Sequence, residues 1–198
     1  AIRFIETYLQ VVSFDEGQDY RQRVAGDGYV FFIEQNKVDS EKSLQQLFND
    51  KVSSLFSVIE EPIGLEKPVN LETTIVLHGR SVACYGRIGG VIWFSFQELC
   101  GSFRSQLDYV DLAKVHHTIF LSDIPQLTGT EEDQARRFIY LIDALYDYNV
   151  VLVASFDVAL SMLYQGSGLV FEFERVLSRL TEMKTVAYLS RPHRGIGS

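Results

Sequence analysis

Two apolar runs, Thr118-Ile119-Phe120-Leu121-Ser122-Asp123 and Val150-Val151-Leu152-Val153-Ala154-Ser155, decide the fold class. Each run is short, contains β-branched or aromatic residues and ends in a polar side chain, which is typical of a buried strand. Between them, residues 131–148 carry apolar side chains at the three-and-four spacing of one helix face. A strand, a helix and a second strand in this order predict a parallel α/β unit.

The neighbouring segments continue this alternation. The step Gly79-Arg80 and the pair Gly89-Gly90 separate three β-rich runs before the first apolar run, which predicts a β-meander with tight reversals. Asn149 is expected to end the central helix, and Thr130 with Asp133 is expected to form a capping box at its start. The meander is predicted over 73–78, 81–88 and 91–96, and further helices over 109–115, 158–164 and 171–184.

The front of the chain is mixed in character, with short strands predicted over 11–14 and 29–33 and an amphipathic helix after Asp39 and Ser40. Pro62 and Pro68 remove backbone donors, so the loop that contains them is the predicted boundary. We therefore expect a lead-in over 1–60 and a C-terminal α/β domain over 61–198. The lead-in begins without Met inside an amphipathic pattern, which suggests a piece of a longer protein.

Composition limits the classes of function. The chain has 198 residues, 46% of them hydrophobic, and a net charge of −8. This is typical of a soluble globular protein and argues against nucleic-acid binding, since phosphate backbones repel an acidic surface. No apolar stretch reaches the roughly 18 residues of a transmembrane segment. The two cysteines, Cys84 and Cys100, are expected to be buried and reduced.

Asp123 and Ser155 are the candidate site residues on the two strands. Active groups gather at the carboxyl ends of parallel strands, and a nucleotide hydrolase places its metal-holding acid and its γ-phosphate sensor there. A polar residue that leaves a buried strand is also commonly a turn or cap. The glycine-rich phosphate loop, G-x-x-x-x-G-K-[ST], is absent from the sequence. The catalytic residues therefore stay unknown.

Several arginines have the chemistry to meet phosphate. Arg136 and Arg137 lie near the strand ends, while Arg175 and Arg179 share a helix face. Ion pairs with acids of their own helices are the alternative for both pairs. Arg104 precedes a helix start in which Ser105 is the N-cap and Asp108 occupies the third position. The adjacent histidines His116 and His117 point to opposite faces of a strand, so no metal site is expected.

Ordered motifs along nearly the whole chain resemble the ZapE family of cell-division ATPases, which are AAA-like P-loop ATPases with mitochondrial relatives. The motifs begin with Gln18-Asp19-Tyr20-Arg21 and Gly79-Arg80 and end with Tyr188-Leu189. Those between are Trp93-Phe94-Ser95-Phe96-Gln97-Glu98-Leu99-Cys100, Arg104-Ser105-Gln106-Leu107-Asp108-Tyr109, His117-Thr118-Ile119-Phe120-Leu121-Ser122-Asp123-Ile124-Pro125, Ala135-Arg136-Arg137-Phe138-Ile139-Tyr140-Leu141-Ile142-Asp143, Phe171-Glu172-Phe173-Glu174-Arg175 and Ser178-Arg179-Leu180-Thr181-Glu182-Met183.

The resemblance implies that this chain is the C-terminal half of such a protein. ATP and Mg would be bound mainly by the N-terminal half, which is also an expected partner, and the chain alone is expected to be inactive. The family resemblance further implies a cytoplasmic protein, peripheral at the inner-membrane division site, that acts on the division ring through FtsZ. The family resemblance is also compatible with a homo-oligomer.

Combining residues and resemblance, we interpret the unit from Thr118 to Ser155 as a degenerate repeat of a P-loop core without its phosphate loop. Arg104, Arg136, Arg137, Arg175, Arg179, Asp123 and Ser155 are the candidates for contacting nucleotide. A non-catalytic interaction module is the competing hypothesis. In that case the arginines make structural ion pairs and the exposed apolar helix faces bind a partner.

Overall fold

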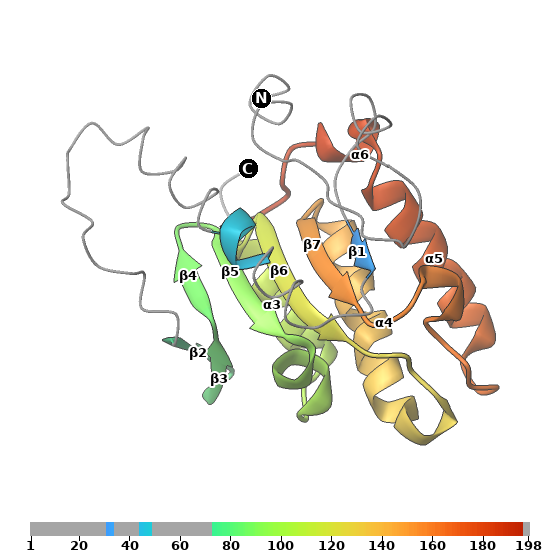
Figure 1. The fold of residues 1–198 in the computed structure, drawn as a ribbon. Coiled ribbons are helices and arrows are strands. Elements are labelled where there is room, and N and C mark those ends of the chain that lie inside the picture. Colours follow the sequence, from blue (N-terminus) through green and yellow to red (C-terminus); the bar gives the residue numbers. More distant parts are fainter. Residues whose placement is uncertain (1–30, 34–43, 49–72, 196–198) are drawn as a thin grey trace, which may run out of the picture.

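The computed structural model describes residues 31–33, 44–48 and 73–195 of the chain (Figure 1). The strand predicted over 11–14 and the proline-containing boundary at Pro62 and Pro68 lie outside the described residues. Within them, residues 44–48 are helical, inside the helix predicted after Asp39 and Ser40.

A five-stranded sheet forms the centre of the fold, and four of its strands are parallel (Figure 1). The fifth, at one edge, pairs antiparallel with its neighbour. In sheet order the strands are β1 (Phe31–Ile33), β7 (Val151–Phe156), β6 (Thr118–Ile124), β5 (Val91–Ser95) and β4 (Gly86–Ile88). The predicted parallel α/β unit is therefore confirmed. The sequence had not indicated that the strand predicted over 29–33 joins this sheet beside β7.

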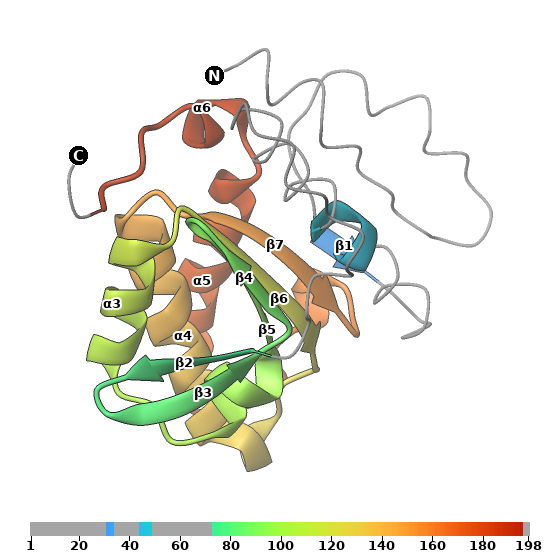
Figure 2. The same ribbon diagram turned by 90° about the vertical axis from the view of Figure 1, so that its left-hand side faces the viewer.

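Helices connect the parallel strands, and most of them lie on one face of the sheet. Figure 2 shows α3, α4 and α5 on that face and the helical residues 44–48 on the other. The helical segments are η2, a π-helical turn (Gln97–Gly101), α3 (Gln106–Val115), η3 (Gly129–Glu131), α4 (Glu132–Asp147), η4 (Leu160–Met162), α5 (Val170–Met183) and α6 (Val186–Leu189). The helix predicted over 158–164 is only the short 3₁₀ turn η4.

The predicted meander differs from the structure, because its middle run breaks at Tyr85. The first part of this run is β3 (Arg80–Cys84), which forms a separate hairpin with β2 (Thr73–Leu77). The second part is β4, which belongs to the main sheet. His78 and Gly79 both have positive φ, which suits the tight reversal of that hairpin. The backbone N–H of Tyr85 donates to the carbonyl oxygen of Trp93 at 2.8 Å.

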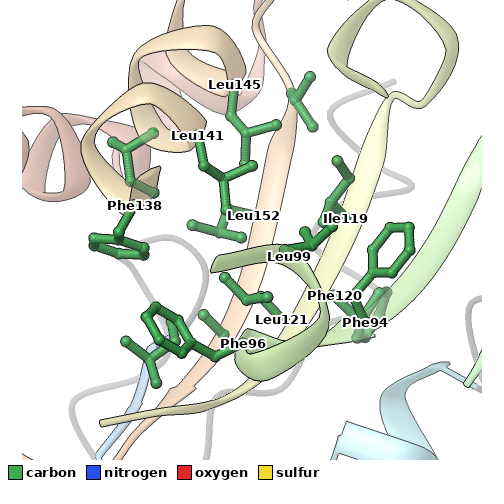
Figure 3. Packing of buried hydrophobic residues seen from close by; sticks show 14 of the residues in the cluster. Phe94, Phe96, Leu99, Ile119, Phe120, Leu121, Phe138, Leu141, Leu145 and Leu152 are labelled. Atoms are coloured by element: carbon green, nitrogen blue, oxygen red, sulfur yellow. The ribbon is translucent and has the colours of Figure 1, made fainter. Parts of the chain in front are cut away.

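Aromatic side chains fill both faces of the sheet. On one face the ring of Phe48 lies 5.7 Å from that of Trp93 and 5.5 Å from that of Phe120, measured between centroids. On the other face Phe138 of α4 packs against Phe96 at 6.0 Å, and Leu141 and Leu145 line the same face of α4 (Figure 3). This two-sided burial explains why β6 and β7 read as continuous apolar runs rather than alternating ones.

The helix ends follow the local chemistry of the chain. Ser105 is the N-cap of α3 as predicted, and with Asp108 it forms a capping box in which the carboxylate of Asp108 accepts from the backbone N–H of Ser105 at 2.6 Å. Asn149 adopts positive φ directly after α4, at the predicted stop. The capping box before α4 is formed by Thr128 and Glu131 through η3, and not by Thr130 and Asp133 as predicted.

Candidate functional site

The carboxyl ends of β6 and β7 meet at one edge of the sheet, and a hydrogen bond joins them there. Asp123 lies near the end of β6, and its backbone N–H donates to the hydroxyl oxygen of Ser155 on β7 at 2.9 Å. Ser155 is buried, whereas Asp123 is partly exposed. The structure therefore brings together the acid and the hydroxyl residue that the sequence placed on two separate strands.

Asp123 also has an unusual backbone conformation. Its φ is +60°, and the register of β6 against β7 is irregular between Leu121 and Ile124. A left-handed residue other than glycine costs roughly 1 kcal/mol or more, although Asp tolerates it better than most residues. Within the described residues the Asp123 carboxylate makes no hydrogen bond or ion pair. Strain at a strand end beside an unpaired carboxylate is typical of functional sites.

The π-helical turn η2 follows β5 at the same edge of the sheet and collects three side-chain donors. Arg104 donates from Nη2 to the carbonyl oxygen of Glu98 at 3.2 Å, and Arg137 donates from Nε to that of Cys100 at 2.6 Å. Between them, the hydroxyl of Tyr109 donates to the carbonyl oxygen of Leu99 at 2.8 Å. These bonds satisfy carbonyls at the end of the turn that lack helical partners.

Ser95 is a polar contributor to this edge that sequence reasoning missed. It ends β5, and its hydroxyl oxygen accepts from the backbone N–H of Glu98 in the first turn of η2 at 3.2 Å. The available signal was its position, because Ser95, Ser122 and Ser155 all stand near the ends of apolar runs. Ser122 lies opposite Ser95 in the parallel register, and its hydroxyl donates to the carbonyl oxygen of Phe94 at 3.4 Å.

Cys100 stands in the middle of this cluster as a buried free thiol, which agrees with the sequence prediction. Burial raises the pKa of Cys100 to about 12, and the nearby charges of Arg137 and Arg104 offset only part of that effect. Burial likewise raises the pKa of Tyr109. Because a thiolate is the reactive form of cysteine, burial disfavours the reactive form of Cys100.

The two remaining candidate arginines lie elsewhere, between α4 and α5. Arg175 contacts the carboxylate of Asp143 at 2.8 Å, and Arg179 contacts both Asp143 and, at 3.7 Å, Asp147. Asp143 is two turns, or about 10 Å, further along α4 than Arg136. The partner acids belong to the neighbouring helix and not to the arginines' own helix, so these contacts join α4 to α5.

Arg136 is exposed on the first half of α4 and has no carboxylate within 4.0 Å among the described residues. The neighbouring acids Glu131, Glu132 and Asp133 therefore do not form the local ion pair that the sequence allowed. Of the seven candidates, the structure places Asp123 and Ser155 in contact with each other, and it places the side chains of Arg104 and Arg137 against the same helical turn, η2. Arg136 lies beside Arg137, while Arg175 and Arg179 are separate from the edge.

Two further features are absent from the described part of the chain. No three His, Cys, Asp or Glu side chains are grouped there so as to hold a metal ion. None of the described helices combines the length and the apolar character needed to cross a bilayer.

Comparison with known proteins gives the chain its family. The model of the AFG1-like ATPase family matches residues 1–192. The cell division protein ZapE of Escherichia coli K12 is 35% identical over 193 residues, which cover 98% of this chain and 48% of that protein. Lactation elevated protein 1 homolog B of Danio rerio is 29% identical, over 94% of this chain and 41% of that protein.

The chain thus spans about half the length of the curated relatives it matches. No solved structure matches it significantly. The matched residues include both strand ends of the candidate edge and all seven candidate residues. The chain belongs to the AFG1-like ATPase family.

Proposed function

We propose that this chain is one half of a protein that hydrolyses ATP and acts on the bacterial division ring. The observation that carries the proposal is the family match over residues 1–192, together with 35% identity to a cell division protein. By the same resemblance, FtsZ is the proposed partner in the ring, and the proposed location is the cytoplasmic side of the division site. ATP with Mg is the proposed cofactor.

The chain's own residues do not make a complete site for Mg-ATP. The sequence contains no glycine-rich phosphate loop, and a nucleotide site needs such a phosphate cradle in addition to an acid such as Asp123. We therefore assign ATP binding mainly to the other half of the protein. In this proposal the present half supplies a rigid edge with arginines that reach the nucleotide, within one protein or across a subunit boundary of a homo-oligomer.

The order of elements in the sheet supports this interpretation. Asp123 and Ser155 stand on adjacent parallel strands joined by α4, as the acid and the sensor do in a nucleotide hydrolase. This arrangement agrees with a degenerate repeat of a P-loop core that has kept its edge but lost its phosphate loop. Arg136 and Arg137, on the first half of α4, are the arginines best placed to reach beyond this edge.

Replacing both Arg136 and Arg137 by Ala tests the proposal in a protein that joins this chain to the other half of the family. We expect ATP turnover to fall roughly tenfold or more, because a guanidinium that meets a phosphate in the transition state contributes at least that factor. Steady-state phosphate release measures it. The matched control is Arg87→Ala, since Arg87 is exposed on β4 at the opposite end of the β4–β5 pair.

Unchanged turnover combined with lost partner binding would contradict this role and support the competing interaction module. Two observations favour that alternative. Arg175 and Arg179 are held by Asp143 in a structural network, and two aromatic side chains stand exposed, Phe103 at 79% and Phe171 at 82%. In the alternative, the chain regulates or docks an ATPase without contacting nucleotide.

A further inference from the structure

Arginines in the described part of the chain fall into two groups by their partners. Arg80, Arg175, Arg179 and Arg191 each contact a carboxylate. The other described arginines have no carboxylate within 4.0 Å among the described residues, and of these only Arg104 and Arg137 are partly buried, whereas Arg87, Arg136 and Arg194 are exposed. In a chain with a net charge of −8, acids are plentiful, so the absence of one at this position is informative.

The two guanidinium groups are held by the same short turn. The anchors are the carbonyl oxygens of Glu98 and Cys100, two residues apart on η2, at 3.2 Å from Arg104 Nη2 and 2.6 Å from Arg137 Nε. Both positive charges act on the thiol of Cys100. The two cations are therefore neighbours, and the surrounding fold fixes both of them before any ligand arrives.

Fixing two like charges together is unfavourable unless a counter-charge joins them. Carbonyl oxygens supply partial charge only, so they orient the two arginines without neutralising them. Asp108, the nearest acid in sequence to Arg104, is already engaged by Arg80 and by the Ser105 backbone. Asp133, the nearest to Arg137, is exposed. The Nε of Arg104 is buried without a hydrogen-bond partner, and Arg137 uses only its Nε on the turn.

We infer that Arg104 and Arg137 form a binding site for a phosphate-type oxyanion at the end of η2. The guanidinium fork matches the oxygen geometry of phosphate, and two forks complement a dianion better than a single carboxylate. Free phosphate and the phosphate group of a nucleotide share this chemistry. Where the phosphate belongs to a nucleotide, the inference rests on the proposed function. The site itself is a property of this chain alone.

Calorimetric titration of the chain with inorganic phosphate tests the inference at constant ionic strength, with chloride as the reference anion. We expect saturable binding that chloride does not reproduce and that Arg104→Gln or Arg137→Gln weakens by about tenfold or more. The control Arg87→Gln removes an exposed cation outside the site and should leave binding unchanged. Absence of saturable binding, or equal weakening by all three substitutions, would overturn the site.

Arg137→Gln also removes the bond to the Cys100 carbonyl, so thermal unfolding of each variant must accompany the titration. If Arg137→Gln does not fold, Arg137→Lys replaces it, because lysine keeps the charge but loses the fork. Weaker phosphate binding by folded Arg137→Lys supports the site, and unchanged binding contradicts it.

Titrating ATP and ADP in competition with phosphate separates the two sources of the ligand. Displacement of phosphate by the nucleotides assigns the site to a nucleotide phosphate, and their failure to compete assigns it to free phosphate. The outcomes also distinguish this inference from the proposed function. Phosphate binding with normal ATP turnover in Arg104 and Arg137 variants keeps the site and removes its role in hydrolysis. If the chain does not bind phosphate but the Arg104 and Arg137 variants lose ATP turnover, the phosphate site is overturned and a role of the two arginines in hydrolysis is kept.

Discussion

Replacing Asp108 by Ala should lower the free energy of unfolding by about 3 kcal/mol, as measured by urea denaturation. The Asp108 side chain is fully buried and contacts Arg80 Nη2 at 2.5 Å across the gap between α3 and β3. Its carboxylate also accepts from the backbone N–H and the hydroxyl of Ser105. Removing it breaks the capping box and leaves Arg80 unpaired. Arg80 is 37% exposed, which keeps the loss near the lower end for a buried pair.

Asp111 provides the matched control on the same helix. It is 44% exposed and contacts His78 at 2.9 Å and Lys114 at 3.7 Å. Because both contacts lie at the surface, Asp111→Ala should change the free energy of unfolding by less than about 1 kcal/mol. Equal losses for the two substitutions would contradict a structural role for the buried Asp108 pair.

His116 should make stability depend on pH between neutrality and pH 4. The residue caps the end of α3, is buried, and has its Nδ1 3.1 Å from the carbonyl oxygen of Leu112. Its Nε2 is buried without a partner. Burial lowers the pKa of His116 from 6.5 to about 4, against the raising effect of the Leu112 bond and with help from Arg87, His117 and His193.

The sign follows from proton linkage. Between pH 6.5 and 4 the unfolded chain binds a proton at this histidine that the folded chain excludes, so stability falls as the pH decreases through that range. A pKa of about 4 in the folded chain, against 6.5 in the unfolded chain, corresponds to a loss of roughly 3 kcal/mol of unfolding free energy when the pH falls from 7 to 4. His116→Gln removes the titrating group and should flatten the profile by that amount.

The control for this prediction is His78→Gln, because His78 is 44% exposed at the hairpin turn. Urea denaturation at several pH values, with wild type and both variants, isolates the contribution of His116 from that of the carboxylates. If wild type and His116→Gln lose stability in parallel between pH 7 and 4, then the buried histidine does not control this range.

The parallel core was predictable because its signal is local. β6, α4 and β7 each carry a periodicity that a stretch of a dozen residues reveals, and both faces of the sheet are covered, so the strands are apolar throughout. The helix starts were partly predictable for the same reason. Ser105 and Asp108 were identified, whereas the true cap before α4 lies at Thr128, because η3 comes before the helix.

Contacts between segments far apart in the sequence could not be predicted from local patterns. The position of β1 beside β7 joins segments that are more than 100 residues apart, and no local pattern encodes it. The contacts of Arg175 and Arg179 left a weak signal, since Asp143 and Asp147 on α4 share their four-residue spacing. The buried Arg80–Asp108 pair and the carbonyl anchors of Arg104 and Arg137 follow only from the packing of η2, α3 and the hairpin.

The sequence predicted which residues lie at the candidate edge, but not their backbone conformation or hydrogen bonds. Asp123 and Ser155 were identified because they end apolar runs, and parallel strands bring such ends together. The left-handed backbone of Asp123 and its bond to the Ser155 hydroxyl arise from the register irregularity in β6, which the sequence does not indicate.

Phosphate release from Mg-ATP is the most direct test of the division of labour between the two halves. It is measured first with this chain alone and then after the other half of the family protein is added. We expect no turnover by the chain alone, since it lacks a phosphate loop, and turnover once the other half is present. Turnover by this chain alone, above that of an Asp123→Ala variant, would contradict the account and place a complete ATP site on the edge of its own sheet.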